Sequence, residues 1–233
     1  MPIRLATTSD LDAIAWVAVA ASPADPIFPY RYPHMDQYPE DFAKYTRIRY
    51  GEYLADPNSV VMVFECPSIE DTSVSKLVAF SIWVPPPSQE PAHAGVSATQ
   101  SALNTTPTGN AQNRKPVDRP ERRDASPARM MAFRANISAA KQRLFDESYG
   151  DSQLYLGMLA CHPDYQRRGA GTQLVEWGIS KARAEKLTLT LFASPMGAFL
   201  YKHLGFRDAG GFRTQVPGED EFLDSKAMVL ELE

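Results

Sequence analysis

Apolar and polar positions along this chain follow the periods of strands and helices in turn. Residues 154–161 are almost continuously apolar, as expected for a strand that is covered on both faces. Pro163 ends this strand, and the next apolar residues recur at helical spacings: Leu174, Val175, Gly178, Ile179 and Ala182. Residues 187–193 alternate and predict a second strand, and Pro195 suits the first turn of a second helix.

The rest of the chain supplies elements on both sides of this unit. Before it, the pattern predicts a strand at residues 3–6, a helix from about residue 11 and a second helix at 41–54. Two strands are predicted after these helices, at 60–65 and 77–84. A helix is expected from about 127 to 148, and two final strands are expected at 207–213 and 226–232. The resulting sheet is mixed, and the expected number of domains is one.

Two segments lack a regular pattern. Residues 22–42 hold five prolines crowded among aromatic residues. The prolines are expected to interrupt any regular element, and the aromatic residues either line a pocket or cap a core. Residues 85–128 hold eight prolines and no Phe, Trp or Tyr, so they cannot bury enough apolar area to offset the entropy of ordering. We expect a long flexible insertion there, and we favour a solvated linker over a binding element.

Composition narrows the class of protein. The 233 residues are 44% hydrophobic, which supports a packed core, and the net charge of −4 gives no sign of nucleic-acid binding. The sequence contains no run of 18 or more apolar residues, which is the length expected of a membrane-spanning helix. Its first residues do not resemble a signal peptide. Cys66 and Cys161 are expected to be buried free thiols, which fits a cytoplasmic protein, and no metal site is expected.

A glycine-containing loop joins the strand at 154–161 to its helix. It reads Gln-Arg-Arg-Gly-Ala-Gly over residues 166–171. Glycines let backbone N–H groups close on an anion, and the helix N-terminus adds partial positive charge, so the loop suits a pyrophosphate. A dinucleotide-binding fingerprint would need glycine where Leu174 stands, and a P-loop would need lysine where Thr172 stands.

Together with a second motif, this loop points to a known family. Residues 194–206 begin with Ser-Pro, a helix start, and end Leu-Tyr-Lys-His-Leu-Gly-Phe, where Gly205 suits a helix C-cap. The two motifs resemble the coenzyme A motifs of the GCN5-related N-acetyltransferase (GNAT) superfamily in order and spacing, most clearly over residues 150–210. The alternative is an unrelated α/β domain with an anion-binding loop.

The resemblance implies a fold and a set of coenzyme contacts. The expected fold is α/β (α+β), with a mixed, mostly antiparallel central sheet flanked by helices, and residues 1–233 form one domain that carries the 85–128 insertion. The main chain at Leu159 and Cys161 is expected to bind the pantetheine arm, and Ser194 stands where many members have Asn. The implied pyrophosphate loop consists of Gln166, Arg167, Arg168, Gly169, Ala170, Gly171 and Thr172. The side chains of the two arginines either add charge or stay idle on the surface.

The resemblance also implies a general acid. Tyr201 matches the tyrosine that protonates the leaving thiolate in many GNAT enzymes, and its alternative role is structural packing on the turn at Gly205. The base is unassigned, because Gly157 and Met158 stand where some members carry a carboxylate. The candidates are His34, Asp36, Glu40, Asp41 and a water chain, whereas His162 is expected to be structural.

These observations predict an enzyme. We expect an acetyl-CoA-dependent N-acetyltransferase that moves an acetyl group directly to a small-molecule amine, with acetyl-CoA as co-substrate. The proline- and aromatic-rich segment at 22–42 looks more like a pocket rim than a peptide groove. A protein or peptide amine and an alcohol remain as alternative acceptors. A non-catalytic sensor or scaffold that binds a coenzyme A ester is the alternative to an enzyme. No oligomeric state is predicted.

Overall fold

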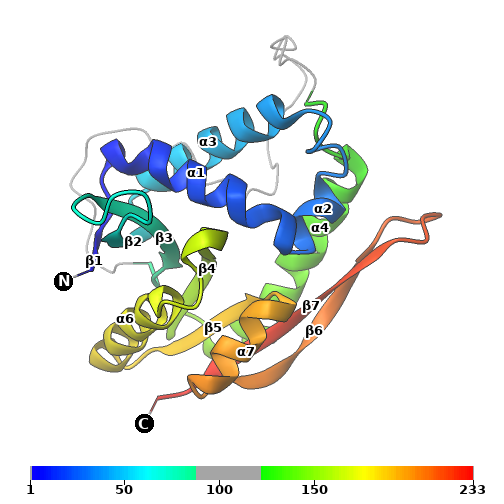
Figure 1. The fold of residues 1–233 in the computed structure, drawn as a ribbon. Coiled ribbons are helices and arrows are strands. Elements are labelled where there is room, and N and C mark those ends of the chain that lie inside the picture. Colours follow the sequence, from blue (N-terminus) through cyan, green and yellow to red (C-terminus); the bar gives the residue numbers. More distant parts are fainter. Residues whose placement is uncertain (1, 88–121, 233) are drawn as a thin grey trace, which may run out of the picture.

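The computed structural model describes residues 2–87 and 122–232. Most of the insertion expected at 85–128 therefore lies outside the described residues. The described part forms a seven-stranded sheet with helices on both faces (Figure 1). The strands are β1 (Ile3–Leu5), β2 (Val60–Pro67), β3 (Ser75–Val84), β4 (Gln153–Cys161), β5 (Thr188–Ala193), β6 (Arg207–Gln215) and β7 (Phe222–Leu230).

The strand order is β1-β2-β3-β4-β5-β7-β6. Within the described sheet, β4 and β5 form the one parallel pair, and the other neighbouring pairs are antiparallel. This arrangement confirms the predicted mixed, mostly antiparallel sheet. The helices are α1 (Leu11–Ala21), α2 (Ile27–Arg31), α3 (Pro39–Ala55), α4 (Pro127–Lys141), α5 (Glu147–Tyr149), α6 (Ala170–Glu185) and α7 (Pro195–His203). A π-helical turn, Gln142–Asp146, joins α4 to α5.

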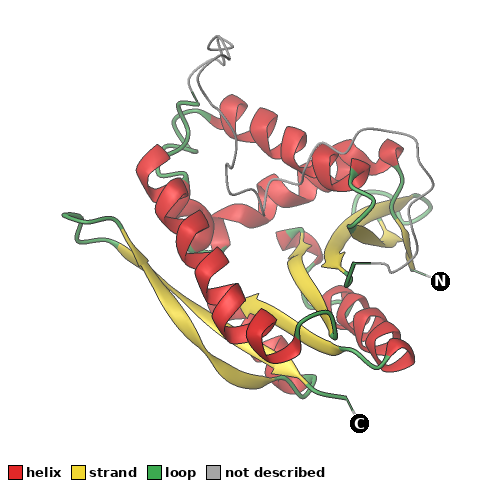
Figure 2. Cartoon of the chain, turned by 180° about the vertical axis from the view of Figure 1, so that it is seen from behind, coloured by secondary structure: helices red, strands yellow, loops and turns green. Residues whose placement is uncertain are grey.

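Alternation along the strands divides the core between the two faces of the sheet. On β2, Met62 and Phe64 join the core under α6, whereas Val61 and Val63 join the core under α1. Helices α6 and α7 lie on the face seen in Figure 1, and α4 crosses the opposite face, in front of the β6–β7 hairpin in Figure 2. Helices therefore pack on both faces of the sheet.

The segment at 22–42 is more regular than its prolines indicate. It contains α2, Ile27–Arg31, although Pro29 lies within that helix. Pro29 is tolerated because it falls in the first turn, where a backbone N–H has no helical acceptor. The expectation that prolines interrupt every regular element there was wrong for these five residues.

The described end of the 85–128 segment does not behave as a solvated linker. Asp124 is fully buried and accepts hydrogen bonds from Arg122 at 2.9 and 2.7 Å. Its carbonyl oxygen accepts from the His34 N–H, and the Ser126 N–H donates to the Arg31 carbonyl. Residues 122–126 therefore dock on the 22–42 segment, so the linker interpretation was wrong for this end.

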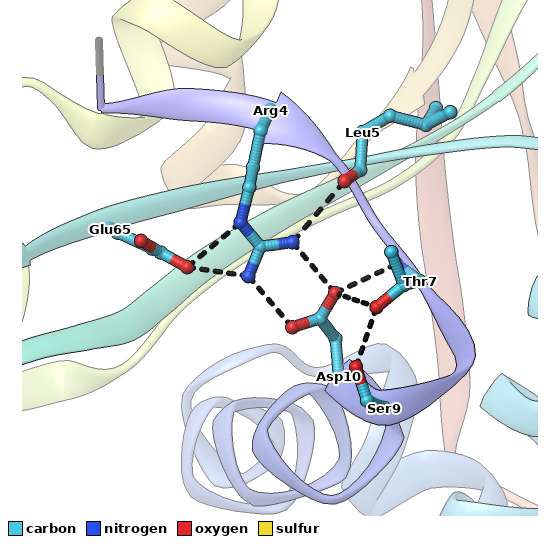
Figure 3. Close-up of polar contacts among 6 residues, drawn as sticks. All are labelled: Arg4, Leu5, Thr7, Ser9, Asp10 and Glu65. Atoms are coloured by element: carbon cyan, nitrogen blue, oxygen red, sulfur yellow. Dashed lines mark hydrogen bonds and ion pairs between the residues drawn. The ribbon is translucent and has the colours of Figure 1, made fainter.

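A small ionic cluster fixes the first strand to the helix that follows it (Figure 3). The Arg4 guanidinium donates to both oxygens of Asp10, at 2.7 and 2.8 Å, and its Nε donates to Glu65 on β2 at 2.9 Å. The Asp10 carboxylate also accepts from the Thr7 N–H at 2.7 Å. The hydrogen bonds from Arg4 lower the pKa of Asp10 to about 2.

We predict that Asp10→Asn lowers the free energy of unfolding by about 1 kcal/mol at pH 7, because a partly exposed ion pair at a helix start is lost. The lowered pKa means that this contribution is complete above about pH 4 and disappears as the pH falls towards 2. Urea unfolding at pH 7 and pH 2.5 measures the difference. Asp12→Asn, which breaks the exposed Arg47 pair, is the control, and an equal loss in both variants would contradict the prediction.

Candidate functional site

The two halves of the sheet separate where β4 and β5 stop pairing with each other. These strands are paired over four residues of β4, from Gln153 to Leu156. Gly157 then forms a bulge against β3, since Ile82 pairs with Met158 and Trp83 with Leu156. Bulges bend and twist a strand, and beyond this one β4 continues beside β3 alone within the described sheet.

The separation leaves an open backbone edge on β4. The His162 N–H donates to the Val78 carbonyl of β3 at 2.9 Å. Because the backbone groups of successive strand residues point to opposite edges, those of Cys161 and Leu159 point away from β3, into the space that β5 has left. The Gln166 side-chain amide, which donates to the Cys161 carbonyl at 3.4 Å, fits this direction. The expectation of a strand covered on both faces was wrong beyond Leu156, because residues 157–161 are exposed or half-buried.

Next to this edge, the loop before α6 presents unpaired N–H groups. Gly169 has φ +84° and precedes the helix, whose first hydrogen bond runs from the Gln173 N–H to the Gly169 carbonyl at 3.0 Å. The N–H groups of Ala170, Gly171 and Thr172 come before that bond and have no acceptor in the helix. No acidic residue lies in the first turn, so the helix end favours an anion.

The side chains of the loop are placed differently from one another. Gln166 bonds to Cys161 on the strand, as described above. Arg168 donates to the Asp164 carbonyl at 3.5 Å and lies 5.2 Å from the centre of the Tyr165 ring. Arg167 is exposed and has φ +63°, an uncommon backbone conformation for a residue with a side chain. The loop's anion-binding groups are therefore mainly its backbone amides.

Helix α7 brings two further predicted residues to the opening. The Ser194 hydroxyl caps the helix by accepting from the Gly197 N–H at 3.1 Å, which leaves its own hydrogen available to donate. Tyr201 is 6% exposed. A Cβ atom built on Gly171 would lie 3.2 Å from Leu200, so the start of α6 and the middle of α7 are in close contact. The structure thus brings the predicted strand, loop and α7 residues together.

A hollow of about 90 Å³ lies where the strands part. Leu156–Leu159 of β4 and Tyr201 of α7 line it, together with Asp25 of the segment that precedes α2. Its apolar walls come from Ile27, Phe133, Ile137, Phe192 and Leu223. A larger hollow of about 580 Å³ lies between α7 and the β6–β7 hairpin and shares Ala193–Pro195 with the smaller one. We place the chemistry in the smaller hollow, because both the open strand edge and Tyr201 line it.

Burial sets the protonation of the two titratable groups that face each other here. It raises the pKa of Tyr201, and the negative charge of Asp25 raises it further, so the phenol keeps its proton at neutral pH. Burial also raises the pKa of Asp25, against the opposing effects of the Ile27 N–H and of Arg31. The sequence analysis missed Asp25, although a lone acid among the prolines and aromatic residues of 22–35 was a usable signal.

The four side chains proposed as bases do not line this hollow. His34, Asp36 and Glu40 are exposed. Asp41 accepts two hydrogen bonds at 2.8 Å from Arg123, which lowers its pKa to about 2. A base whose pKa is that low is weak at neutral pH.

Two comparisons with known proteins agree with this geometry. A family model described as "Acetyltransferase (GNAT) domain" matches residues 136–208, which include β4, the loop, α6, β5 and α7. A protein of Stachybotrys chartarum named "Acetyltransferase" is 27% identical over 227 residues, which cover 97% of this chain and 89% of that protein. The family-model match, this relative and the fold together support membership of the GNAT superfamily.

Solved structures share the GNAT fold with this chain at low sequence identity. A structure of "histone acetyltransferase HPA2 and related acetyltransferase" from Corynebacterium glutamicum has a TM-score of 0.56 and 18% identity, and the match covers 98% of this chain and 94% of that one. A PaiA N-acetyltransferase from Thermoplasma acidophilum, solved in complex with coenzyme A, has a TM-score of 0.50 and 11% identity over the full length of both chains.

GNAT proteins are acyltransferases that take an acetyl group from acetyl-CoA, and the features above fit such a ligand. Main-chain groups along the strand edge can pair with the amides of the pantetheine arm, and the loop amides suit the pyrophosphate of the coenzyme. Among residues 2–87 and 122–232, no group of three or more His, Cys, Asp or Glu could hold a metal ion. No helix in these ranges is both long and apolar enough to cross a membrane.

We predict that Gly169→Ala weakens coenzyme A binding at least tenfold, because a side chain disfavours φ +84° by about 1–2 kcal/mol and the loop amides turn away from the anion. Isothermal titration calorimetry measures the affinity. Gly218→Ala is a matched control, since Gly218 has φ +88° in a turn between β6 and β7 with no atom within 4 Å of the added Cβ. Equal affinities of the two variants would show that the loop does not hold the coenzyme.

Proposed function

We propose that this protein is an acetyl-CoA-dependent N-acetyltransferase that transfers the acetyl group directly to a small-molecule amine. The observation that carries the proposal is a hollow lined by the open edge of β4 and by the buried Tyr201, with the start of α6 packed against that edge, since a Cβ atom on Gly171 would lie 3.8 Å from Leu159. Direct transfer needs the thioester and the amine to be held together, and this arrangement offers a place for both.

Each feature has a role in positioning the acyl donor. The amides of Arg167–Thr172 hold the pyrophosphate, and Gly169 gives the loop its left-handed turn. The backbone groups of Leu159 and Cys161 pair with the pantetheine arm as a neighbouring strand would. The Ser194 hydroxyl, whose oxygen caps α7, donates its hydrogen to the same arm. Recognition by the main chain explains how so apolar a strand binds a polar ligand.

Tyr201 serves as the general acid in this proposal. Its phenol lies in the wall of the hollow beside the open edge, and its raised pKa keeps the proton on the oxygen until a thiolate forms next to it. When the C–S bond of the thioester breaks, the coenzyme sulfur takes that proton. The phenol is then protonated again from solvent.

The dimensions of the site favour a small acceptor. The hollow of about 90 Å³ is bounded by α4, by β7 and by the turn before α2. Such a bounded space suits the amino group of a small molecule better than an extended peptide, which needs a long open groove.

A non-catalytic domain that binds a coenzyme A ester is the second candidate. It is favoured by the lack of a carboxylate at Gly157 and Met158 on the open edge. Such a sensor would bind the coenzyme tightly without turning it over, so activity measurements separate it from the enzyme.

We predict that Tyr201→Phe lowers kcat at least ~10²-fold and leaves the affinity for coenzyme A unchanged, because a proton donor is lost while the binding groups stay. Thiol release from acetyl-CoA, followed over a panel of amines, gives the rate. Tyr50→Phe is the matched control: Tyr50 is 1% exposed, its hydroxyl has no hydrogen-bond partner among the residues that the structure describes, and it does not line the hollow. Full activity of Tyr201→Phe would refute the acid, and tight binding with no turnover of any amine would favour the sensor.

A further inference from the structure

Asp25 is a carboxylate that the reaction outlined above does not yet use. It lies between the 3₁₀ turn Ser22–Ala24 and α2, in the wall of the hollow that also contains Gly157 and Tyr201. Asp25 and Tyr201 line the same hollow, and the negative charge of Asp25 contributes to the raised pKa of the Tyr201 phenol. A nucleophile between them would be flanked by a proton acceptor and a proton donor.

The Asp25 carboxylate is only partly occupied by the protein. Its Oδ1 accepts from the Ile27 N–H at 3.1 Å. The described part of the chain provides it with no ion-pair partner and no hydrogen bond to Oδ2. The second acid in the wall, Asp224, differs because it accepts two hydrogen bonds from Arg213 at 2.7 and 2.8 Å. Asp25 is therefore the wall carboxylate with an oxygen left to bind a ligand.

The remaining surroundings select the kind of ligand. No lysine or arginine lines the hollow, and of its two acids Asp224 is paired with Arg213, so the carboxylate of Asp25 is the charge that favours a cationic group over an anionic one. The charged and titratable groups that face Asp25 are Arg31 from α2, Tyr201 from α7 and, across the hollow, Asp224 from β7. The other walls are apolar, contributed by α4, β5 and β7 through Phe133, Ile137, Phe192 and Leu223, and they suit a hydrocarbon chain or an aromatic ring.

We propose that Asp25 binds the ammonium group of the acceptor and takes its protons, and that the acceptor is a primary amine carried on an apolar chain or ring. This inference rests on the proposed N-acetyltransferase function and adds the missing base and the substrate class. Asp25 touches the substrate in this scheme, so it is a catalytic residue.

The protons balance over one turnover. The ammonium gives its first proton to Asp25, which passes it to solvent, and the neutral amine attacks the thioester carbonyl. As the C–N bond forms, the nitrogen gives a second proton to Asp25. The C–S bond breaks, and the sulfur takes the proton of Tyr201, which Asp25 or solvent then replaces. The products are the amide, free coenzyme A and one released proton.

The test compares Asp25→Asn with the wild-type chain, using acetyl-CoA with 2-phenylethylamine, hexylamine, spermidine and a lysine-containing peptide. Asparagine keeps an oxygen for the Ile27 N–H, so the turn before α2 is retained. Asp25→Ser, which can accept the same bond, is the second variant in case the first unfolds. Asp151→Asn, an exposed acid in the turn before β4, is the matched control. Thermal unfolding and coenzyme A affinity are measured for every variant.

We expect the wild-type chain to acetylate the two apolar amines in preference to spermidine and the peptide. Asp25→Asn should lower kcat/KM for them at least ~10²-fold at pH 7, with coenzyme affinity unchanged. The deficit should shrink as the pH rises towards the pKa of the amine, because more amine then arrives neutral. A structural role for Asp25 would not produce this pH dependence.

Three results would overturn the inference. Activity of Asp25→Asn and Asp25→Ser equal to that of the control would remove Asp25 from catalysis. A preference for spermidine or the peptide would refute the substrate class. Coenzyme binding without turnover of any amine by the wild-type chain would refute the proposed function itself and the inference with it.

Discussion

The site depends on the point where β4 and β5 cease to pair. Backbone N–H and C=O groups away from water need partners, and a strand that loses its neighbour exposes a row of them. Here the loss follows the bulge at Gly157, after which β4 stays with β3 while β5 stays with β7. The hollow at this opening is lined from one face of the sheet by α4 and from the other by α7, which fits the proposed transfer between two ligands. A ligand that offers amide groups in an extended chain completes the broken ladder.

Packing holds the rest of the site against this opening. A Cβ atom on Gly178 would lie 2.1 Å from the Trp83 ring, so only glycine lets α6 approach β3 this closely. The Trp83 indole N–H is itself satisfied by the Ser81 hydroxyl at 2.9 Å. At the other end of the loop, the buried Tyr165 hydroxyl accepts from the Ile69 N–H at 3.1 Å. The amides at the start of α6 are therefore fixed from both sides, which spares a bound anion the entropic cost of ordering them.

The parts of the site that could be predicted from the sequence are those encoded locally. The loop at 166–171 carries its own signal, because glycine spacing, a preceding strand and a following helix lie within one stretch of chain. The mixed sheet was predictable in the same way. Asp25 was harder to predict, because it shares a hollow with Tyr201, far away in the sequence, and its being the lone acid of 22–35 does not indicate what it faces. The exposed half of β4 escaped prediction because an apolar strand looks the same whether protein or ligand covers it.

The chemistry of Asp25 also bears on why the chain carries an acid there. Its hydrogen bond to the Ile27 N–H could be made by asparagine or serine with no charge to desolvate. Because burial raises the pKa of Asp25 in the folded chain, folding favours its protonated form, and the ionised carboxylate lowers the stability of the fold as the pH rises through that pKa. In a purely structural turn, the attraction between the Asp25 carboxylate and Arg31 offsets only part of this cost, because burial still raises the pKa. A base that must accept a proton from an ammonium group gains from it, since a raised pKa makes the carboxylate a stronger acceptor near neutral pH. The raised pKa of Asp25 is thus consistent with the acid–base role proposed for it.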